Sequence, residues 1–410
     1  MFLAPKYSQS IKKLLSSSDL IFRWRGLFAT YIFTASAKFV NEMYTRDQYS
    51  RAGFARRILN HAVGPGIAAQ NKDRSKVKRD IMMPFMKSAR YDILFESIYT
   101  NFQREIGSRP STFDLSEALQ HAVSCAMLTE HFGIELTEAQ KKRLLEDFIP
   151  LPDHVKNSKR LFAAKFFKKM PLFIQKIILG SDERYTIRNQ QISKSFFEYL
   201  YQEGINRPGS LVEALVEAYQ SGVITYDELI GEYGSTMGSA YTLTESLISS
   251  CVFLAKYTDE QTKTGNDFNH AKHAFLETLR LRASFPTLAY EEVAPKSKCP
   301  FHFWQRKNVI IVSVLELQSN TKYWGEDAED FRPDRFAVGL SSFEKGAFIP
   351  FGGGERRCPA SGMTMTVGSK FIHSICKDYN FTLISKEPEL KKLFGLHRVE
   401  KPIFFKFEKK

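Results

Sequence analysis

The chain of 410 residues is 43% hydrophobic and 25% charged, a balance that excludes a collagen-like, low-complexity or coiled-coil protein. Its five cysteines are widely spread and never form a C-x-x-C pair, which argues against a disulfide framework and against a zinc site. A net charge of +13 favours an acidic partner, but no nucleic-acid-reading module accompanies it, so we expect no nucleic-acid binding.

The N-terminal region gives no signal for membrane insertion or secretion. Its most apolar stretch, Leu27 to Val40, is short and contains Lys38, so we predict no transmembrane segment. The apolar residues Phe2 to Ala4 run directly into Lys6, which is not a secretory pattern. We therefore expect a soluble, cytoplasmic protein.

The first elements in chain order are two strands, predicted at Leu20 to Trp24 and at Ala29 to Thr34 on either side of a turn. A helix fits Ala37 to Met43. The segment Gly64 to Gly66 then breaks the chain before a basic helical run from Asp73 to Met83.

Helix dominates the middle of the chain, because apolar residues recur at three and four spacing from about Phe113 to Tyr257. The β-branched run Val309 to Leu317 predicts a strand. We expect Tyr379 to Ser385 and Pro402 to Phe407 to pair as a terminal hairpin. The predicted fold is mostly α with small β-sheets (α+β), in a single domain over 1–410. Its helix-rich core covers about 37–290 and its strand and loop region about 291–410.

The segment Val155 to Leu179 interleaves seven lysines and arginines with four phenylalanines. Two interpretations fit this pattern. One is an ordinary amphipathic surface helix with snorkelling lysines. The other is peripheral contact with a membrane surface, or the lining of an access route.

The most informative peptide runs from Phe348 to Ala360 and reads FIPFGGGERRCPA. Its glycines let the backbone approach a flat or bulky ligand, while Arg356 and Arg357 surround the Cys358 sulfur with positive charge that favours the thiolate. Such a thiolate is a metal ligand or a nucleophile. The nucleophile is the weaker alternative, because the nearest histidine, His373, belongs to no recognisable motif.

Phe351, Gly354, Arg356 and Cys358 fit the pattern F-x-x-G-x-R-x-C, and this peptide resembles the haem-binding signature of the cytochromes P450. The resemblance implies haem b (iron protoporphyrin IX) with Cys358 as the axial thiolate, which favours O–O cleavage. It also implies that Arg356 pairs with a haem propionate and that Phe351 packs near the sulfur.

Upstream, Glu277 to Arg280 resembles the E-x-x-R motif of the same family, and Tyr323 to Phe336 resembles its aromatic and P-E-R-F segment. Order and spacing agree, and the resemblance covers roughly Asp19 to the C-terminus. It implies that Glu277 and Arg280, one helical turn apart, join Arg335 in a charged structural network behind the haem.

The predicted basic helix holds two further cofactor-binding candidates. Arg74 and Lys78 lie four residues apart on one face. The family usually places an aromatic or histidine and an arginine there, for the haem propionates. Both residues keep or add positive charge.

The central helix departs from the family pattern, which places an acid and a threonine over the haem. The stretch Tyr233 to Thr244 contains no carboxylate. Aligned from the later Leu254 to Tyr257, it puts Tyr241 at the acid and Thr242 at the alcohol, our catalytic candidates. Aligned on Gly238, it puts Ala240 and Tyr241 there instead.

Two smaller departures lie elsewhere. Ala360 replaces the glycine that follows Cys-Pro, and the segment Phe285 to Ala294 lacks the cation that the family often supplies for a propionate.

The resemblance implies a soluble, bacterial-type monooxygenase that oxidises an apolar small molecule. Its electrons would come from a separate acidic ferredoxin, flavodoxin or reductase, attracted by a basic face to which Arg357 and the Lys78-Arg79 pair contribute. One alternative is a haem-thiolate enzyme that uses peroxide or isomerises its substrate without the acid–threonine relay. A second alternative is a degenerate, non-catalytic member that binds haem or a ligand.

Overall fold

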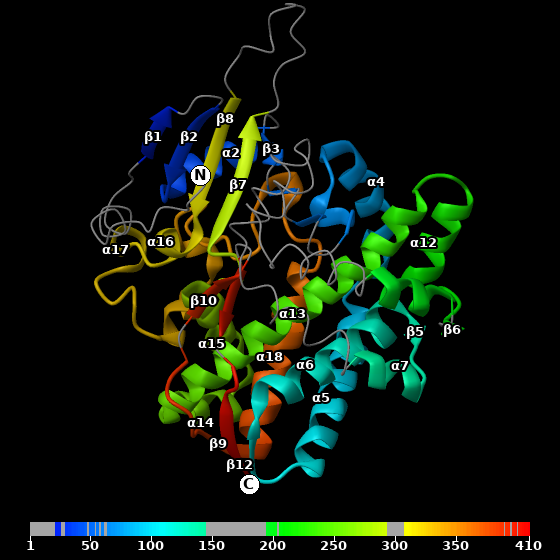
Figure 1. Ribbon diagram of the computed structural model, residues 1–410. Helices are drawn as coiled ribbons and strands as arrows, with labels where there is room; N and C mark the ends of the chain where they lie inside the picture. The colour runs from blue at the N-terminus through cyan, green and yellow to red at the C-terminus, as the bar shows by residue number, and fades with distance from the viewer. Residues whose placement is uncertain are drawn as a thin grey trace, which may run out of the picture.

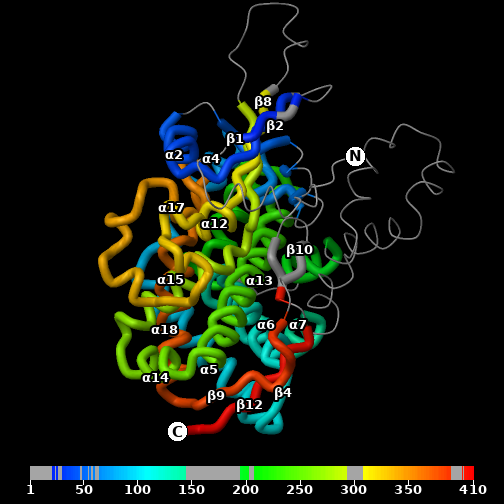
Figure 2. The backbone as a smooth tube through the Cα atoms, turned by 90° about the vertical axis from the view of Figure 1, so that its left-hand side faces the viewer, coloured from blue at the N-terminus to red at the C-terminus, as the bar shows by residue number. Residues whose placement is uncertain are grey.

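A computed structural model describes most of the chain, namely residues 21–25, 29–46, 49–53, 55–56, 59–60, 64–144, 194–202, 205–292, 307–388, 390–393, 396–399 and 401–410. A helical block carries small sheets at opposite ends (Figures 1 and 2), so the predicted mostly α fold with small sheets is confirmed. The basic, aromatic segment 155–179 lies outside the described residues. The single domain over 1–410 stays a prediction.

The largest sheet has five strands in the order β1-β2-β8-β7-β3. They are β1 (Ile21–Arg25), β2 (Ala29–Thr34), β8 (Lys307–Ser313), β7 (Thr287–Glu292) and β3 (Tyr49–Arg51). Strands β2 and β8 run parallel, and the other neighbours are antiparallel. The register of β3 and β7 sets Arg51 opposite Tyr290. Both predicted N-terminal strands are confirmed.

The predicted strand Val309 to Leu317 is wrong beyond Ser313, where α16 (Val314–Gln318) begins. Residues 315–318 are good helix formers. The turn also buries the amide of Gln318, which donates to Leu279 O and Arg280 O at 3.2 and 2.9 Å. These long-range bonds override the local strand preference.

The helical block is built around α13 (Tyr226–Lys256), which packs against α6, α15 and α18 (Figure 1). Thr225 and Glu228 form a capping box that starts it. The other α-helices are α2 (Ala37–Thr45), α4 (Lys72–Met82), α5 (Ala89–Ser108), α6 (Leu115–Ala126), α7 (Glu138–Arg143), α12 (Leu211–Gln220), α14 (Thr258–Asn266), α15 (Phe268–Leu281), α17 (Thr321–Trp324) and α18 (Ser361–Asp378). Tighter or wider turns are η1 (Ile67–Ala69), η2 (Met83–Phe85), η3 (Met127–Phe132), η6 (Pro333–Val338), η7 (Leu340–Ser342) and η8 (Gly354–Arg356).

The C-terminal strands form a second sheet in the order β4-β12-β9, at the end of the block away from the large sheet (Figure 2). Its strands are β4 (Thr112–Asp114), β12 (Phe404–Lys409) and β9 (Tyr379–Leu383). The predicted antiparallel pairing of the last two segments is confirmed, with Phe381 opposite Phe407. They do not form a simple hairpin, because β10 (Leu390–Leu393) and β11 (Leu396–Val399) pair between them. A short ladder joins β5 (Ile134–Glu135) and β6 (Ile205–Asn206).

Candidate functional site

The cysteine peptide forms a tight loop between η8 and the start of α18. The backbone N–H of Cys358 donates to Phe351 O at 2.9 Å and closes the loop. Gly352 and Gly354 have φ values of 68° and 60°, a left-handed conformation that costs glycine least. Cys358 is partly exposed and forms no disulfide. A single accessible sulfur therefore stands on a fixed turn.

The floor of this loop is an aromatic ring from α2. A Cβ atom at Gly353 would lie 2.3 Å from the Tyr44 ring, so only glycine fits there. The Tyr44 hydroxyl lies 2.9 Å from the Tyr290 hydroxyl of β7, and the two rings meet edge to face. This tyrosine pair links the loop to the large sheet.

Burial and positive charge act in opposite directions on the Cys358 thiol. Burial raises its pKa, while the Ala360 backbone N–H and the arginines 79, 51 and 357 oppose the rise without cancelling it. The nearby positive charge and main chain favour the thiolate, as expected, but by less than burial opposes it. A metal ion bound to the sulfur would supply further positive charge, because a thiol that coordinates a metal loses its proton.

Two arginines beside the loop have no carboxylate partner among the described residues. Arg356 makes only long contacts of 3.4 to 3.5 Å, to the carbonyls of Ile67, Gln70 and Asn71. Arg51 donates to Ala68 O at 3.0 Å.

Burial, with the like charge of Arg51, lowers the pKa of Arg356 to about 10. Crowded, half-buried cations without counter-ions favour an anionic ligand.

These features fit haem, which combines an iron for a thiolate with carboxylates for arginines. Cys358 offers the sulfur, Gly353 the open backbone, and Arg51 and Arg356 the positive charge. The sequence analysis missed Arg51, because it lies in β3, far from any motif. Only the register of β3 with β7 brings it beside Tyr290, where a family cation was missing.

Arg74 and Lys78 are not placed as expected. Both side chains point from α4 to carboxylates of α13. Arg74 forms an ion pair with Glu228. Lys78 is fully buried, lies 3.0 Å from Glu232 Oε1 and donates to Pro65 O at 2.5 Å. The two side chains are already neutralised, so their assignment to the propionates is corrected, and Lys78 cannot belong to an exposed basic face.

One face of α13 is open along part of its length. Between residues 228 and 254, every residue is buried except Ser235, Gly238, Ser239 and Thr242. Their spacing of three, one and three residues places them on a single helical face. The four residues of that face are partly exposed, and the backbone of Gly66 approaches it at Ser235.

The structure separates the two catalytic candidates. Thr242 lies on the open face, and its hydroxyl donates to Ser239 O at 3.0 Å. Tyr241 is buried on another face, where burial and the charge of Glu245 raise its pKa. Although 233–244 holds no carboxylate, α13 also carries the buried acids Glu228, Glu232 and Glu245, which the motif comparison missed.

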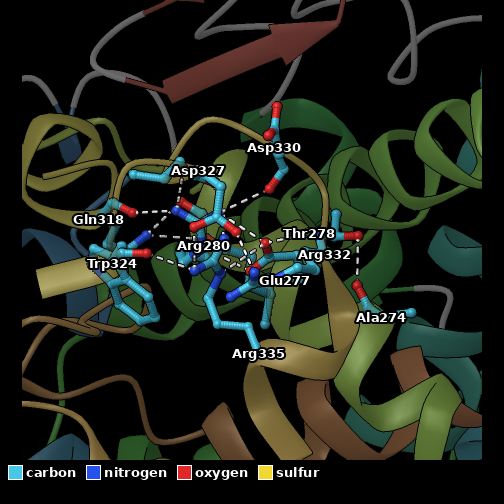
Figure 3. A network of polar contacts seen from close by, with 12 residues as sticks. Ala274, Glu277, Thr278, Arg280, Gln318, Trp324, Asp327, Asp330, Arg332 and Arg335 are labelled. Atoms are coloured by element: carbon cyan, nitrogen blue, oxygen red, sulfur yellow. Dashed lines mark hydrogen bonds and ion pairs between the residues drawn. The ribbon is translucent and has the colours of Figure 1, made fainter. Parts of the chain in front are cut away.

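Glu277, Arg280 and Arg335 do meet in a buried network (Figure 3). Arg280 Nε lies 2.6 Å from Glu277 Oε2, and Arg335 Nε lies 3.4 Å from Glu277 Oε1. The exposed fractions of these residues are 0%, 1% and 8%. Arg280 also donates to the carbonyls of Gln318 and Ala328, both at 2.6 Å.

We predict that Glu277→Gln destabilises the protein by about 3 to 5 kcal/mol, because it leaves the buried Arg280 guanidinium without its carboxylate, whereas Arg335 keeps Asp327 at 3.1 Å. The matched control is Glu408→Gln, whose partner Lys406 is 45% exposed, and which should change stability by about 0 to 1 kcal/mol. Chemical denaturation of both variants measures the difference. Equal, small effects would show that the network carries little stability.

No helix within the described residues combines the length and apolar character needed to cross a membrane. A family model described as Cytochrome P450 matches residues 263–407. Cytochrome P450 71A14 of Arabidopsis thaliana is 26% identical over 208 residues, which are 50% of this chain and 39% of that protein.

Other relatives match shorter stretches. Echinocystic acid 23-monooxygenase of Saponaria officinalis is 43% identical over 18% of this chain and 15% of its own length. Cytochrome P450 monooxygenase iccC of Talaromyces variabilis is 34% identical over 23% of this chain and 18% of its own length. The chain thus spans less than half the length of these curated relatives.

The family match contains both the E-x-x-R turn of α15 and the cysteine loop. The motifs that carried the resemblance therefore lie inside the matched region, in the same order and joined by one buried network. Residues 263–407 are thus similar to the cytochrome P450 family, which is also the family of two of the relatives named above.

Proposed function

We propose that this protein is a haem-thiolate monooxygenase that oxidises an apolar small molecule. The observation that carries the proposal is the Cys358 loop, whose partly exposed cysteine lies beside Arg51 and Arg356, two arginines with no carboxylate partner in the part of the chain that the structure describes. The family relation supports the same chemistry, and two of the relatives are named as monooxygenases.

Each part of the site has a role in this proposal. Haem b, when bound, activates oxygen at an iron that the Cys358 thiolate holds. The Ala360 backbone N–H bonds to that sulfur and tunes it. Arg356 and Arg51 neutralise the propionates, and Phe351 packs beside the sulfur.

The surroundings orient this centre. Gln318 accepts from the Ile349 N–H at 2.9 Å and so ties the cysteine peptide to the Glu277 network. The open face of α13, with Thr242, borders the space for oxygen and substrate.

The partner and location belong to the proposal as well. We expect electrons from an acidic ferredoxin, flavodoxin or reductase that docks near Arg79 and Arg357, since Arg79 donates to Arg357 O at 2.8 Å and both flank the loop. Lys78 takes no part in this face because it is buried. The bacterial-type assignment and the cytoplasmic location stay predictions.

Replacing the proposed ligand tests the haem assignment. We predict that Cys358→Ala abolishes the red-shifted Soret band of the reduced carbon monoxide complex, because the variant removes the cysteine sulfur of the loop. Cys125→Ala, at a buried cysteine of α6, is the control and should keep the band. Absorption spectra of both reduced variants give the readout. A band that persists in Cys358→Ala would make the ligand assignment wrong.

The propionate role of Arg51 predicts weaker haem binding in Arg51→Gln. Loss of a charge-assisted bond of about 1.5 to 3 kcal/mol should speed haem transfer to an excess of apomyoglobin roughly ten- to hundredfold. Arg56→Gln is the control, because Arg56 already pairs with Glu291 at 3.2 Å. If both variants lose haem equally fast, Arg51 has no special role.

A second candidate function is a haem-thiolate enzyme that uses peroxide. The observation in its favour is that Thr242 has no carboxylate beside it on the open face, so the usual acid–threonine pair is missing. Peroxide already carries the electrons and protons that dioxygen must receive, so its use depends less on a proton-donating pair. The isomerising and non-catalytic alternatives have no specific observation of their own.

Two hydroxyl-deleting variants separate these functions. If dioxygen and a donor drive turnover, Thr242→Val should lower donor-driven turnover by about 10²-fold or more, with peroxide-driven turnover little changed. Thr244→Val removes a buried hydroxyl that bonds to Ala240 O on another face, and should affect neither. Turnover with peroxide but none with any donor in the unmodified protein would favour the second candidate.

A further inference from the structure

A line of polar side chains follows one face of α13. Glu232, Ser235, Ser239 and Thr242 are separated by three, four and three residues, which keeps them on one side of an α-helix. The Cβ atoms of neighbouring residues at this spacing lie about 5 to 6 Å apart, a gap that one water molecule can bridge. Three of the four border the open side of the helix.

The N-terminal end of this line is a buried acid. The side chains of Glu232 and Lys78 are both 0% exposed, and Lys78 Nζ lies 3.0 Å from Glu232 Oε1. Lys78 Nζ also lies 3.8 Å from Glu228 Oε1, and Glu228 pairs with Arg74, whose side chain is 36% exposed. Alternating charges therefore connect the surface to Glu232.

The buried end of the line is poorly satisfied. The Glu232 carboxylate has the Lys78 ammonium and the Ile67 backbone N–H as its neighbours, and the Ser235 hydroxyl is buried without a partner. A Cβ atom at Gly66 would lie 1.8 Å from Ser235 Oγ, so the backbone of 64–66 covers this end directly. Buried polar atoms without partners mark sites for water or for proton transfer.

The other end has free acceptor capacity. Ser239 donates to Thr236 O at 2.7 Å and Thr242 donates to Ser239 O at 3.0 Å. Each hydroxyl oxygen keeps lone pairs that accept a bond from the residue or water before it. A proton can therefore be passed to these hydroxyls from the side of Glu232, and each hydroxyl hands on its own proton when it turns away from the carbonyl to which it now donates.

We propose that Glu232 is the acid of this site and that Ser235, Ser239 and Thr242 carry its proton toward bound oxygen. The inference rests on the proposed monooxygenase function and names the residues that replace the missing acid–threonine pair.

The transfer is a chain of single proton steps. The Glu232 carboxyl group gives its proton to the nearest hydroxyl or water, and each member passes on its own proton as it accepts the one behind. The proton that leaves Thr242 goes to the reacting oxygen. The carboxylate then regains one proton from solvent along the side of Glu228 and Arg74. No electron moves in the relay.

The surroundings of Glu232 agree with a reserve of protons. Burial raises the pKa of Glu232, and the Lys78 ammonium opposes the rise. The other charged group that acts on it is Glu228, whose negative charge adds to the rise.

Glu245 provides the matched control. It is also a buried acid of α13, with an exposed fraction of 4% against 0% for Glu232. It lies away from the open face, accepts from the Val399 N–H at 2.8 Å and sits 3.5 Å from Lys401. Glu245→Gln thus removes a buried carboxyl group of the same helix, but on a side away from the open face.

The test uses the holoprotein, after the carbon monoxide spectrum has shown that the thiolate site is intact. Without that spectrum the proposed function itself fails. Infrared difference spectra on photolysis of the carbon monoxide complex should contain a carboxyl C=O band that Glu232→Gln removes and Glu245→Gln keeps. With a donor, Glu232→Gln should lower coupled turnover about 10²-fold or more and leave peroxide-driven turnover little changed.

Glu232→Gln removes the nearer of the two carboxylates that contact Lys78. If this single variant does not fold, the double variant Glu232→Gln with Lys78→Met replaces it in the same measurements. Ser239→Ala, compared with Thr244→Val, tests the middle of the line by the same turnover ratio. A C=O band that survives loss of Glu232, or no band at all, overturns the proposal. So does a Glu245→Gln variant that loses donor-driven turnover while the Glu232 variants keep it.

Discussion

The buried contact of Glu277 with Arg280 and Arg335 fixes the part of the molecule on which the site depends. The stretch from α16 to η6 contains only short helical turns, and its carbonyls converge on the two guanidinium groups. Arg335 takes the carbonyls of Trp324 and Asp327 at 2.6 and 2.9 Å. An otherwise irregular segment thereby acquires one shape, because each arginine has several fixed donors to satisfy.

A second group of arginines in the molecule has poorly satisfied hydrogen-bond donors. The Arg280 guanidinium donates to one carboxylate and three carbonyls, whereas Arg356 makes only long contacts of 3.4 to 3.5 Å. The Arg280 group is linked to the cysteine peptide through Gln318, which accepts from the Ile349 N–H, whereas Arg356 lies within that peptide. Arginines whose N–H groups are all paired with carboxylates and carbonyls make the surrounding segment rigid. Arginines without such partners favour the binding of an anion. This contrast distinguishes the framework of the site from its binding residues.

Local patterns in the sequence predicted the features whose geometry is itself local. Three residues separate Glu277 from Arg280 on one helix, so their contact follows from helical geometry alone. Glycines 352 and 354 likewise follow from the tight turn at Cys358. Arg51 could not be predicted, since its place depends on the pairing of β3 with β7.

The errors have the same origin. Arg74 and Lys78 share a face of α4, as the spacing predicted, but no local pattern shows that α13 meets that face with Glu228 and Glu232. The strand predicted through Leu317 stopped at Ser313 because the Gln318 side chain bonds to distant carbonyls. In each of these missed contacts, the two residues lie more than about 30 positions apart in the sequence.

The buried pair of Lys78 and Glu232 needs an explanation beyond stability. Desolvation of two charges generally offsets their attraction, so apolar side chains of similar size would hold α4 against α13 about as well. Lys78 keeps Glu228 Oε1 as a second carboxylate at 3.8 Å, so its charge stays paired when Glu232 holds a proton. The cluster thus places an acid in the interior while keeping the helices together. Its position at the head of the open, hydroxyl-bearing face of α13 is where a proton donor is of use, and this is the arrangement that an acid directly beside Thr242 would otherwise provide.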